Sequence, residues 1–233
     1  MSASNVLVIA VDGPAGSGKS SVCRGVAVKL GMRYLDTGAM YRAMTVAVLV
    51  AGVDVADEAG VEAVAEHTSI ICGTDPSAPE VCLDGRDVAE SIRGSEVTAA
   101  VSAVSAVPAV RQRLVEIQRS QVQAARDADV GIVVEGRDIG TVVVPEADLK
   151  IFLVADPAVR AQRRALENSA GELPEPARVA VTEAELLKRD AYDSGREISP
   201  LTQADDARVV DTTNFTLNEV IEQVCVLATG VQR

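Results

Sequence analysis

The segment V-L-V-I-A-V-D-G-P-A-G-S-G-K-S occupies residues Val6 to Ser20. Its apolar start, Val6 to Val11, is typical of a parallel strand buried on both faces. Gly13 to Ser20 then fits the pattern G-x-x-x-x-G-K-[S/T] at every fixed position. A helical pattern runs from Lys19 to Leu30, and Gly31 stands where a helix commonly ends in a left-handed residue. Strand, glycine-rich turn and helix in this order predict a phosphate-binding loop.

Each fixed position of this loop has a chemical reason. Glycines let the backbone curl so that successive N–H groups point at phosphate oxygens, and the helix adds its positive N-terminal end. We expect Lys19 to reach the β- and γ-phosphates of a nucleotide, and the Ser20 hydroxyl to ligate Mg²⁺. The alternative is a chance glycine-rich turn, which would not explain the strand before it and the helix after it. Nucleotide binding is therefore the first prediction.

The rest of the chain alternates between strand and helix patterns. Further strands are predicted at 32–35, 131–135, 149–154 and 208–211, and helices at 40–51, 57–66, 96–125 with a break near Pro108, and from Pro157 onward. Two S/T-x-x-E pairs, Thr182 with Glu185 and Thr216 with Glu219, predict capping boxes that begin the last two helices. Residues 69–87 are expected to form a small β-hairpin insert, and residues 168–178, which hold Gly171, Pro174 and Pro176, a mobile loop. This alternation predicts a three-layer α/β fold with a mainly parallel sheet.

Composition excludes several classes of protein. The net charge of −12 argues against a nucleic-acid partner, which would normally meet a basic face. No apolar run has the ~20 residues of a membrane span, and residues 1–5 lack the features of a signal peptide, so we expect a cytoplasmic protein without a membrane partner. Four cysteines without a C-x-x-C pair and a single histidine, His67, do not make a zinc set. A monomer is the expected state.

The kind of phosphate-loop protein follows from what accompanies the loop. The guanine-reading sequence N-K-x-D is absent, whereas arginines are spread through the chain after the loop. Transfer between two anionic nucleotides needs such residues, because the guanidinium fork binds phosphate oxygens in pairs. Arg189, Asp193 and Arg196 are spaced to share one helix face, although a surface ion-pair ladder would show the same spacing. The arginines in question are Arg42, Arg111, Arg137, Arg163, Arg164, Arg189 and Arg196.

Four segments together resemble the bacterial cytidylate kinases, in the family's order and over nearly the whole chain. They are Y-L-D-T-G-A-M-Y-R at 34–42, Ser102 with Pro108 and Arg111, E-G-R-D-I-G-T-V-V at 135–143, and 189–196. The resemblance implies an α/β/α phosphate-loop kinase core with a mainly parallel five-stranded sheet. It divides the single domain of 1–233 into a core (about 1–38, 105–157 and 180–233), a nucleotide-binding region with a β-rich insert (about 39–104) and a lid (about 158–179).

The same resemblance implies transfer of the γ-phosphoryl group of ATP to CMP or dCMP with Mg²⁺ as cofactor, giving ADP and CDP or dCDP. Lys19, Arg137 and Arg189 are the expected catalytic residues. The implied ATP contacts are Gly13, Pro14, Ala15, Gly16, Ser17, Gly18, Lys19, Ser20 and Ser21, with Arg163 and Arg164 from the lid. The implied acceptor contacts are Asp36, Thr37, Arg42, Ser102, Arg111, Arg137, Asp138, Arg189, Asp193 and Arg196. Among these, Arg42, Arg137 and Arg189 would hold the phosphate and Asp193 the sugar hydroxyls.

Recognition of cytosine needs an acceptor facing the N4 amino group and donors facing N3 and O2. Asp138 would supply the first, Ser102 and Arg111 the second, so UMP should be a poor acceptor. Two positions depart from the family pattern: Thr37 stands where Ser is common, and Glu135 where the shorter Asp is common. Three other interpretations remain open. They are a kinase for AMP, UMP or shikimate, a regulatory module that hydrolyses ATP slowly, and a kinase that binds without catalysis, against which the intact Lys19 and Ser20 argue.

Overall fold

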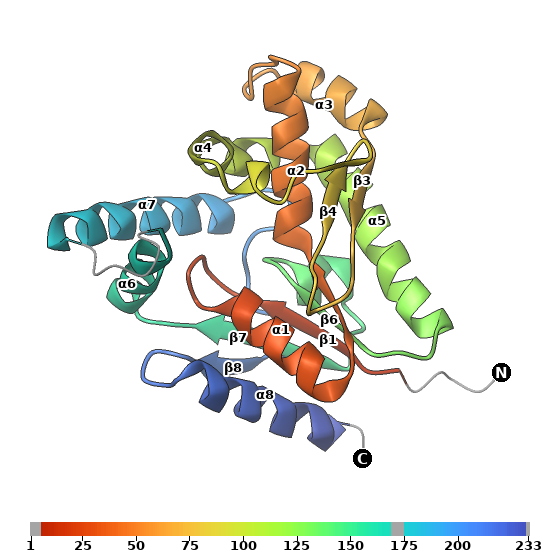
Figure 1. Cartoon of the computed structure of the whole chain (residues 1–233), viewed down its shortest axis with the longest axis vertical. Helices are drawn as coiled ribbons and strands as arrows, with labels where there is room; N and C mark the ends of the chain where they lie inside the picture. The colour runs from red at the N-terminus through yellow and green to blue at the C-terminus, as the bar shows by residue number, and fades with distance from the viewer. Residues whose placement is uncertain (1–5, 169–174, 232–233) are drawn as a thin grey trace.

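The computed structural model describes residues 6–168 and 175–231. Its main sheet has five strands, all paired in parallel, in the order β2-β6-β1-β7-β8 (Figure 1). The strands are β1 (Val8–Asp12), β2 (Arg33–Asp36), β6 (Ile132–Glu135), β7 (Leu149–Val154) and β8 (Arg208–Asp211). β1 is buried along its whole length, as its unbroken apolar run requires. The predicted parallel five-stranded sheet is confirmed.

Helices cover both faces of this sheet. On one face lie α1 (Lys19–Leu30) and α8 (Leu217–Val231), whose apolar side chains share a core with Ile9 and Val133. On the other face lie α2 (Thr37–Val50) and α5 (Pro108–Asp127), packed on Val8 and Val134. Three layers with a central parallel sheet result, as predicted.

The predicted hairpin insert is a separate antiparallel sheet of three short strands, which stands against α2 in Figure 1. Asp84 and Gly85 form its second turn, both with positive φ, which suits a tight two-residue hairpin. The elements of this region are α3 (Glu58–His67), β3 (Ile70–Cys72), β4 (Val81–Leu83), β5 (Arg86–Asp87), the short helix η1 (Ser91–Arg93) and α4 (Ser95–Val104). The Asp57 side chain caps α3, the helix predicted at 57–66, by accepting from the N–H of Gly60.

Two helices, α6 (Pro157–Asn168) and α7 (Pro176–Ser194), lie side by side at one edge of the molecule (Figure 1). The predicted capping box at Thr182 is wrong, because α7 already begins at Pro176 and the Thr182 hydroxyl donates to the carbonyl of Arg178 inside the helix. Of the predicted mobile loop, Gly171 and Pro174 lie outside the described residues. The second predicted capping box is confirmed, since Glu219 accepts from the backbone N–H of Thr216 at 2.8 Å.

The remaining boundaries follow from local caps. α2 begins three residues before the predicted start, since the Asp36 carboxylate accepts from the N–H of Ala39 and caps the helix there. α1 ends at Gly31 with φ +64°, as predicted. Across residues 6–168 and 175–231, no helix is both long enough and apolar enough to cross a membrane.

Candidate active site

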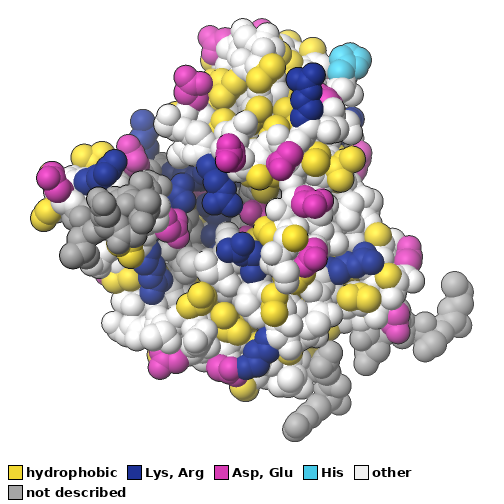
Figure 2. Space-filling view, viewed as in Figure 1, with side chains coloured by type: hydrophobic (Ala, Val, Ile, Leu, Met, Phe, Trp, Pro, Cys, Tyr) yellow, Lys and Arg dark blue, Asp and Glu magenta, His cyan; other side chains and the backbone are white. Residues whose placement is uncertain are grey.

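A cleft of about 360 Å³ opens where the phosphate loop, α2, the insert, α6 and α7 meet. Dark-blue basic side chains gather in this hollow in Figure 2, although the chain as a whole carries a net charge of −12. The basic residues that line it are Lys19, Arg24, Arg42, Arg93, Arg137, Arg164 and Arg189. A concentration of positive charge in one hollow of an acidic protein indicates an anionic ligand.

The phosphate loop at the floor of the cleft is shaped by its glycines. Gly13 has φ +147°, and a Cβ placed on it would lie 2.1 Å from the carbonyl oxygen of Leu153. Gly18, with φ +87°, is the residue from which α1 starts. The Lys19 ammonium donates to the carbonyl oxygens of Gly13 and Pro14, both at 2.8 Å, and burial lowers the pKa of Lys19 to about 7. The loop therefore holds its lysine folded against its own backbone.

Glu135 ends β6 beside the loop. The phenol of Tyr34 donates to its carboxylate. Burial, and next the charge of Asp36, raise the pKa of Glu135. Thr37, the other departure from the family pattern, donates its hydroxyl to the backbone carbonyl of Glu135 at 2.7 Å. Both departures from the family pattern thus lie in one buried cluster.

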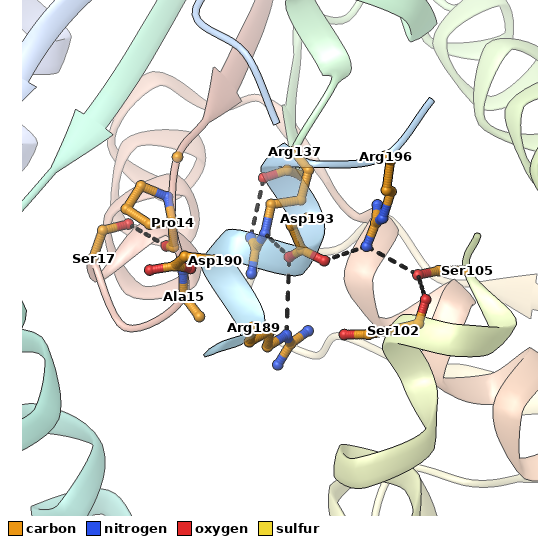
Figure 3. Close-up of polar contacts among 12 residues, drawn as sticks. Pro14, Ala15, Ser17, Ser102, Ser105, Arg137, Arg189, Asp190, Asp193 and Arg196 are labelled. Carbon is orange, nitrogen blue, oxygen red and sulfur yellow. Dashed lines mark hydrogen bonds and ion pairs between the residues drawn. The ribbon is translucent and has the colours of Figure 1, made fainter. Parts of the chain in front are cut away.

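Asp193 on α7 binds three arginines (Figure 3). Its carboxylate accepts from Arg137 at 3.1 Å and from Arg196, and lies 4.0 Å from Nε of Arg189. The Asp193 side chain is 2% exposed, so this cluster is desolvated. The Nε atom of Arg189 is buried and has no hydrogen-bond partner among the described residues. Burial, followed by the charges of Arg137 and Arg42, lowers the pKa of Arg189. One carboxylate does not balance these cations, which leaves the cluster suited to a phosphate.

The residues predicted to read cytosine also lie together. Arg111 forms a buried ion pair with Asp138 and donates to the backbone carbonyl of Ser105 at 3.1 Å. The Ser105 hydroxyl donates to the carbonyl of Ser102 and accepts from Arg196, which connects this pair to the Asp193 cluster. The guanidinium of Arg111 lies over the ring of Tyr41, 5.4 Å from its centroid.

The remaining predicted residues occupy different surroundings. Asp36 and Arg42 line the cleft, and Arg42 donates to the carbonyl of Ile92 at 2.9 Å and to the Thr98 hydroxyl at 3.0 Å. Arg164 also lines it, whereas Arg163 is not among the lining residues.

Instead, the Arg163 guanidinium binds the side chain and carbonyl of Thr212, whose hydroxyl donates to the carbonyl of Ser17. In this structure Arg163 therefore supports the loop from outside.

Sequence reasoning missed four residues that hold the site in shape. Asp12 accepts from the N–H groups of Ile139 and Gly140, Arg160 and Asp190 bind the loop at Ala15, and Ser105 joins Arg111 to Arg196. Only Asp12 could have been found from the sequence, because it directly precedes the phosphate loop. The others bind across tertiary contacts that no local pattern reveals.

Comparisons with known proteins agree with this geometry. A sequence model described as cytidylate kinase matches residues 9–229. A cytidylate kinase of Streptomyces avermitilis is 56% identical over 95% of this chain and 92% of its own length, and one of Nocardia farcinica is 51% identical over 96% and 94%. The crystal structure of an uncharacterized protein from Eubacterium ventriosum, 11% identical, superposes with a TM-score of 0.52 over 96% of this chain and 98% of its own, which concerns the fold alone. The chain belongs to the cytidylate kinase family.

Proposed function

We propose that the protein transfers the γ-phosphoryl group of ATP to CMP or dCMP, giving ADP and CDP or dCDP. The observation that carries this proposal is the meeting of three groups around one cleft: the phosphate loop, the arginine cluster on Asp193, and the buried Arg111–Asp138 pair. The names of the relatives support the choice of acceptor. An acceptor kinase needs all three groups, whereas an enzyme that only hydrolyses ATP needs the first.

On the donor side, the loop from Gly13 to Ser21 would cradle the phosphates of ATP with backbone N–H groups other than that of Ala15, which donates to Asp190. Lys19 would exchange its bonds to Gly13 and Pro14 for the β- and γ-phosphate oxygens. The residues present fit Mg²⁺, because the Ser20 hydroxyl faces the cleft with Glu135 and Asp36 beside it. The ion would neutralise charge on the β- and γ-phosphates. The described residues include no cluster of three or more His, Cys, Asp or Glu side chains that could hold a metal.

On the acceptor side, Arg42, Arg137 and Arg189 would hold the phosphate of CMP, with Arg196 close by. Asp193 would then turn from its arginines toward the sugar hydroxyls. No general base is needed, because the attacking phosphate oxygen is already anionic, so positioning and charge neutralisation provide the catalysis. Lys19, Arg137 and Arg189 would carry the charge of the transferring group.

Asp138 would accept from the N4 amino group of cytosine, and Ser102 and Arg111 would donate to N3 and O2. Uracil presents a donor at position 3 and an acceptor at position 4, so it leaves two buried groups of this site unsatisfied. We further propose that Arg163 and Arg164, in a lid of residues 158–179, contact ATP on closure, that residues 39–104 form the acceptor region, and that the protein acts as a cytoplasmic monomer.

The test is release of ADP from ATP and Mg²⁺ with CMP, dCMP, UMP, AMP and shikimate offered separately. Turnover confined to CMP and dCMP is the expected result. Turnover with another acceptor would be consistent with ATP binding at the phosphate loop. It would contradict the proposed contacts of Ser102, Arg111 and Asp138 with cytosine. Turnover with none of them would contradict the proposal and favour a regulatory module.

A further inference from the structure

A largely buried ion pair, Arg160 with Asp190, joins α6 and α7 directly to the phosphate loop. Nη1 of Arg160 donates to the carbonyl oxygen of Ala15 at 3.0 Å and also to Oδ2 of Asp190. Oδ1 of Asp190 accepts from the N–H of the same Ala15 at 3.1 Å, and Figure 3 shows the two residues together at the loop. The two side chains are 5% and 16% exposed. Both polar groups of Ala15 are thus bound from outside the loop.

Apolar packing lies beside this ion pair. Ala15 forms a small core with Ala161 of α6 and Leu186 of α7. Gly16 is equally close, because a Cβ on it would lie 3.2 Å from Cβ of Arg160. Replacing a buried ion pair with apolar residues is often neutral for stability, so we assign the attachment of the two helices to the loop to this apolar packing. The ion pair instead fixes the direction in which the Ala15 peptide points.

The position of Asp190 on α7 gives this contact a further consequence. Arg189 and Asp193 are four residues apart and share the face of α7 that meets the arginine cluster. Asp190 lies about 100° around the helix from Arg189, on the side of the loop. A shift of Asp190 against Ala15 would therefore move Arg189 against the donor phosphates by a similar amount.

We infer that Arg160 and Asp190 are positioning residues, which set the phosphate loop and Arg189 in register for phosphoryl transfer. The inference rests on the proposed function, because it assigns Arg189 to the transferring group. Loss of the pair removes no group that touches either nucleotide but changes the distance between the phosphate loop and Arg189. A displacement of about 1 Å at a reacting centre is enough to cost about 100-fold in rate.

The experiment uses the full chain with three substitutions of similar size: Arg160→Met, Arg160→Lys and Asp190→Asn. We expect Arg160→Met and Asp190→Asn to lower kcat by about 10- to 100-fold, while KM for CMP stays within about 3-fold. Arg160→Lys should recover much of the loss, because one ammonium can donate to both oxygens that Nη1 binds. The double variant Arg160→Met/Asp190→Asn should be no slower than the slower single variant, because the pair acts as one unit.

Hydrogen exchange at the Ala15 amide provides a readout that needs no acceptor. Loss of the carboxylate should speed this exchange by about 10-fold in Asp190→Asn. The matched control is the surface ion pair of Arg126, in the last turn of α5, with Glu146. Arg126→Met and Glu146→Gln should change neither exchange at Ala15 nor kcat.

The outcomes separate the two proposals. If the parent protein does not act on CMP, the proposed function fails. The kcat values of the variants and the parent protein are then compared with the acceptor that the parent protein does use. An unchanged kcat in Arg160→Met and Asp190→Asn would overturn the positioning role, whether or not exchange at Ala15 changes. Equal losses in Arg160→Lys and Arg160→Met, matched by an equal loss of unfolding free energy, would overturn it in favour of a structural role.

Discussion

The carboxylate of Asp12 accepts a hydrogen bond of 2.8 Å from the backbone N–H of Gly140. Asp12 ends the central strand immediately before the phosphate loop, and Gly140 follows the segment that carries Arg137 and Asp138. A second bond of 2.8 Å, from Ile139, uses the other oxygen. One buried side chain therefore ties the start of the donor loop to the segment that would read the acceptor.

Asp12 should give the protein a measurable pH dependence. Burial raises its pKa from the ordinary 3.8 to about 6, partly offset by the two N–H groups and by Lys19, and further raised by Asp138. The folded protein thus holds this proton more tightly than the unfolded chain, so the stabilisation is complete below about pH 4 and is lost as pH rises through about 6. The difference in unfolding free energy between parent and Asp12→Asn should therefore fall by about 2 kcal/mol from pH 4 to pH 7. Urea unfolding at four pH values measures it, and a constant difference would contradict the assignment.

Asp138→Asn should weaken discrimination between CMP and UMP. The amide no longer offers only acceptors to N4 of cytosine, so we expect kcat/KM for CMP to fall by about 100-fold or more, with UMP affected less. Asn keeps an acceptor for Arg111, which Ala would leave as an unpaired buried charge. Initial rates with both nucleotides measure the effect. Asp127→Asn, exposed near the end of α5, is the control and should match the parent; an unchanged preference in Asp138→Asn would refute base reading by this carboxylate.

Asp193→Asn should make the stability of the protein depend on added anions. Removal of its charge leaves Arg137, Arg189 and Arg196 without their shared counter-ion, which should cost about 3–5 kcal/mol of unfolding free energy. Inorganic phosphate binds such a cluster more tightly once the competing carboxylate is neutral. Thermal unfolding with and without phosphate should show a larger rise in Tm for the variant than for the parent. Equal rises in both proteins would mean that the cluster is not an anion site.

Two glycines of the phosphate loop should differ sharply when changed to alanine. At Gly18 the added Cβ meets no atom of residues 6–168 or 175–231 within 4 Å, so Gly18→Ala should cost only the left-handed backbone strain of about 1–2 kcal/mol. At Gly13 the Cβ would collide with the backbone of Leu153, so Gly13→Ala should cost more than about 4 kcal/mol. Urea unfolding of the two variants tests the difference. Similar losses of unfolding free energy would show that the backbone around Leu153 shifts to make room for the added Cβ.

Much of the fold could be predicted because its signals are local. The strand at Leu149–Val154 and the helix at Lys19–Leu30 have the predicted bounds, since apolar runs and caps lie within the segments themselves. The two S/T-x-x-E pairs show the limit of such signals. Thr216 caps α8 as predicted, but Thr182 lies inside a helix that Pro176 had already started, and the pattern around Thr182 contains no sign of this.

The site could be predicted in part for the same reason. The motifs identified Lys19, Arg111, Asp138 and Asp193, and the structure brings the last three into two connected buried clusters. Arg160 and Asp190 were missed because their partner, Ala15, lies far from both in the sequence. Such contacts are decided by how α6 and α7 pack on the loop, which no local pattern encodes.

The strand order has a consequence for how the chain is made. β1 lies between β6 and β7, so Val8 pairs with Ile132 and Ile9 with Leu149. During synthesis the phosphate-loop sequence leaves the ribosome long before either partner of its central strand, since β6 begins only at Ile132 and β7 at Leu149. Such late pairing of distant strands is slow, and it leaves an apolar strand exposed meanwhile. A nascent chain that stops before Leu149 would carry the complete loop sequence but only one of the two neighbours that hold β1 in place.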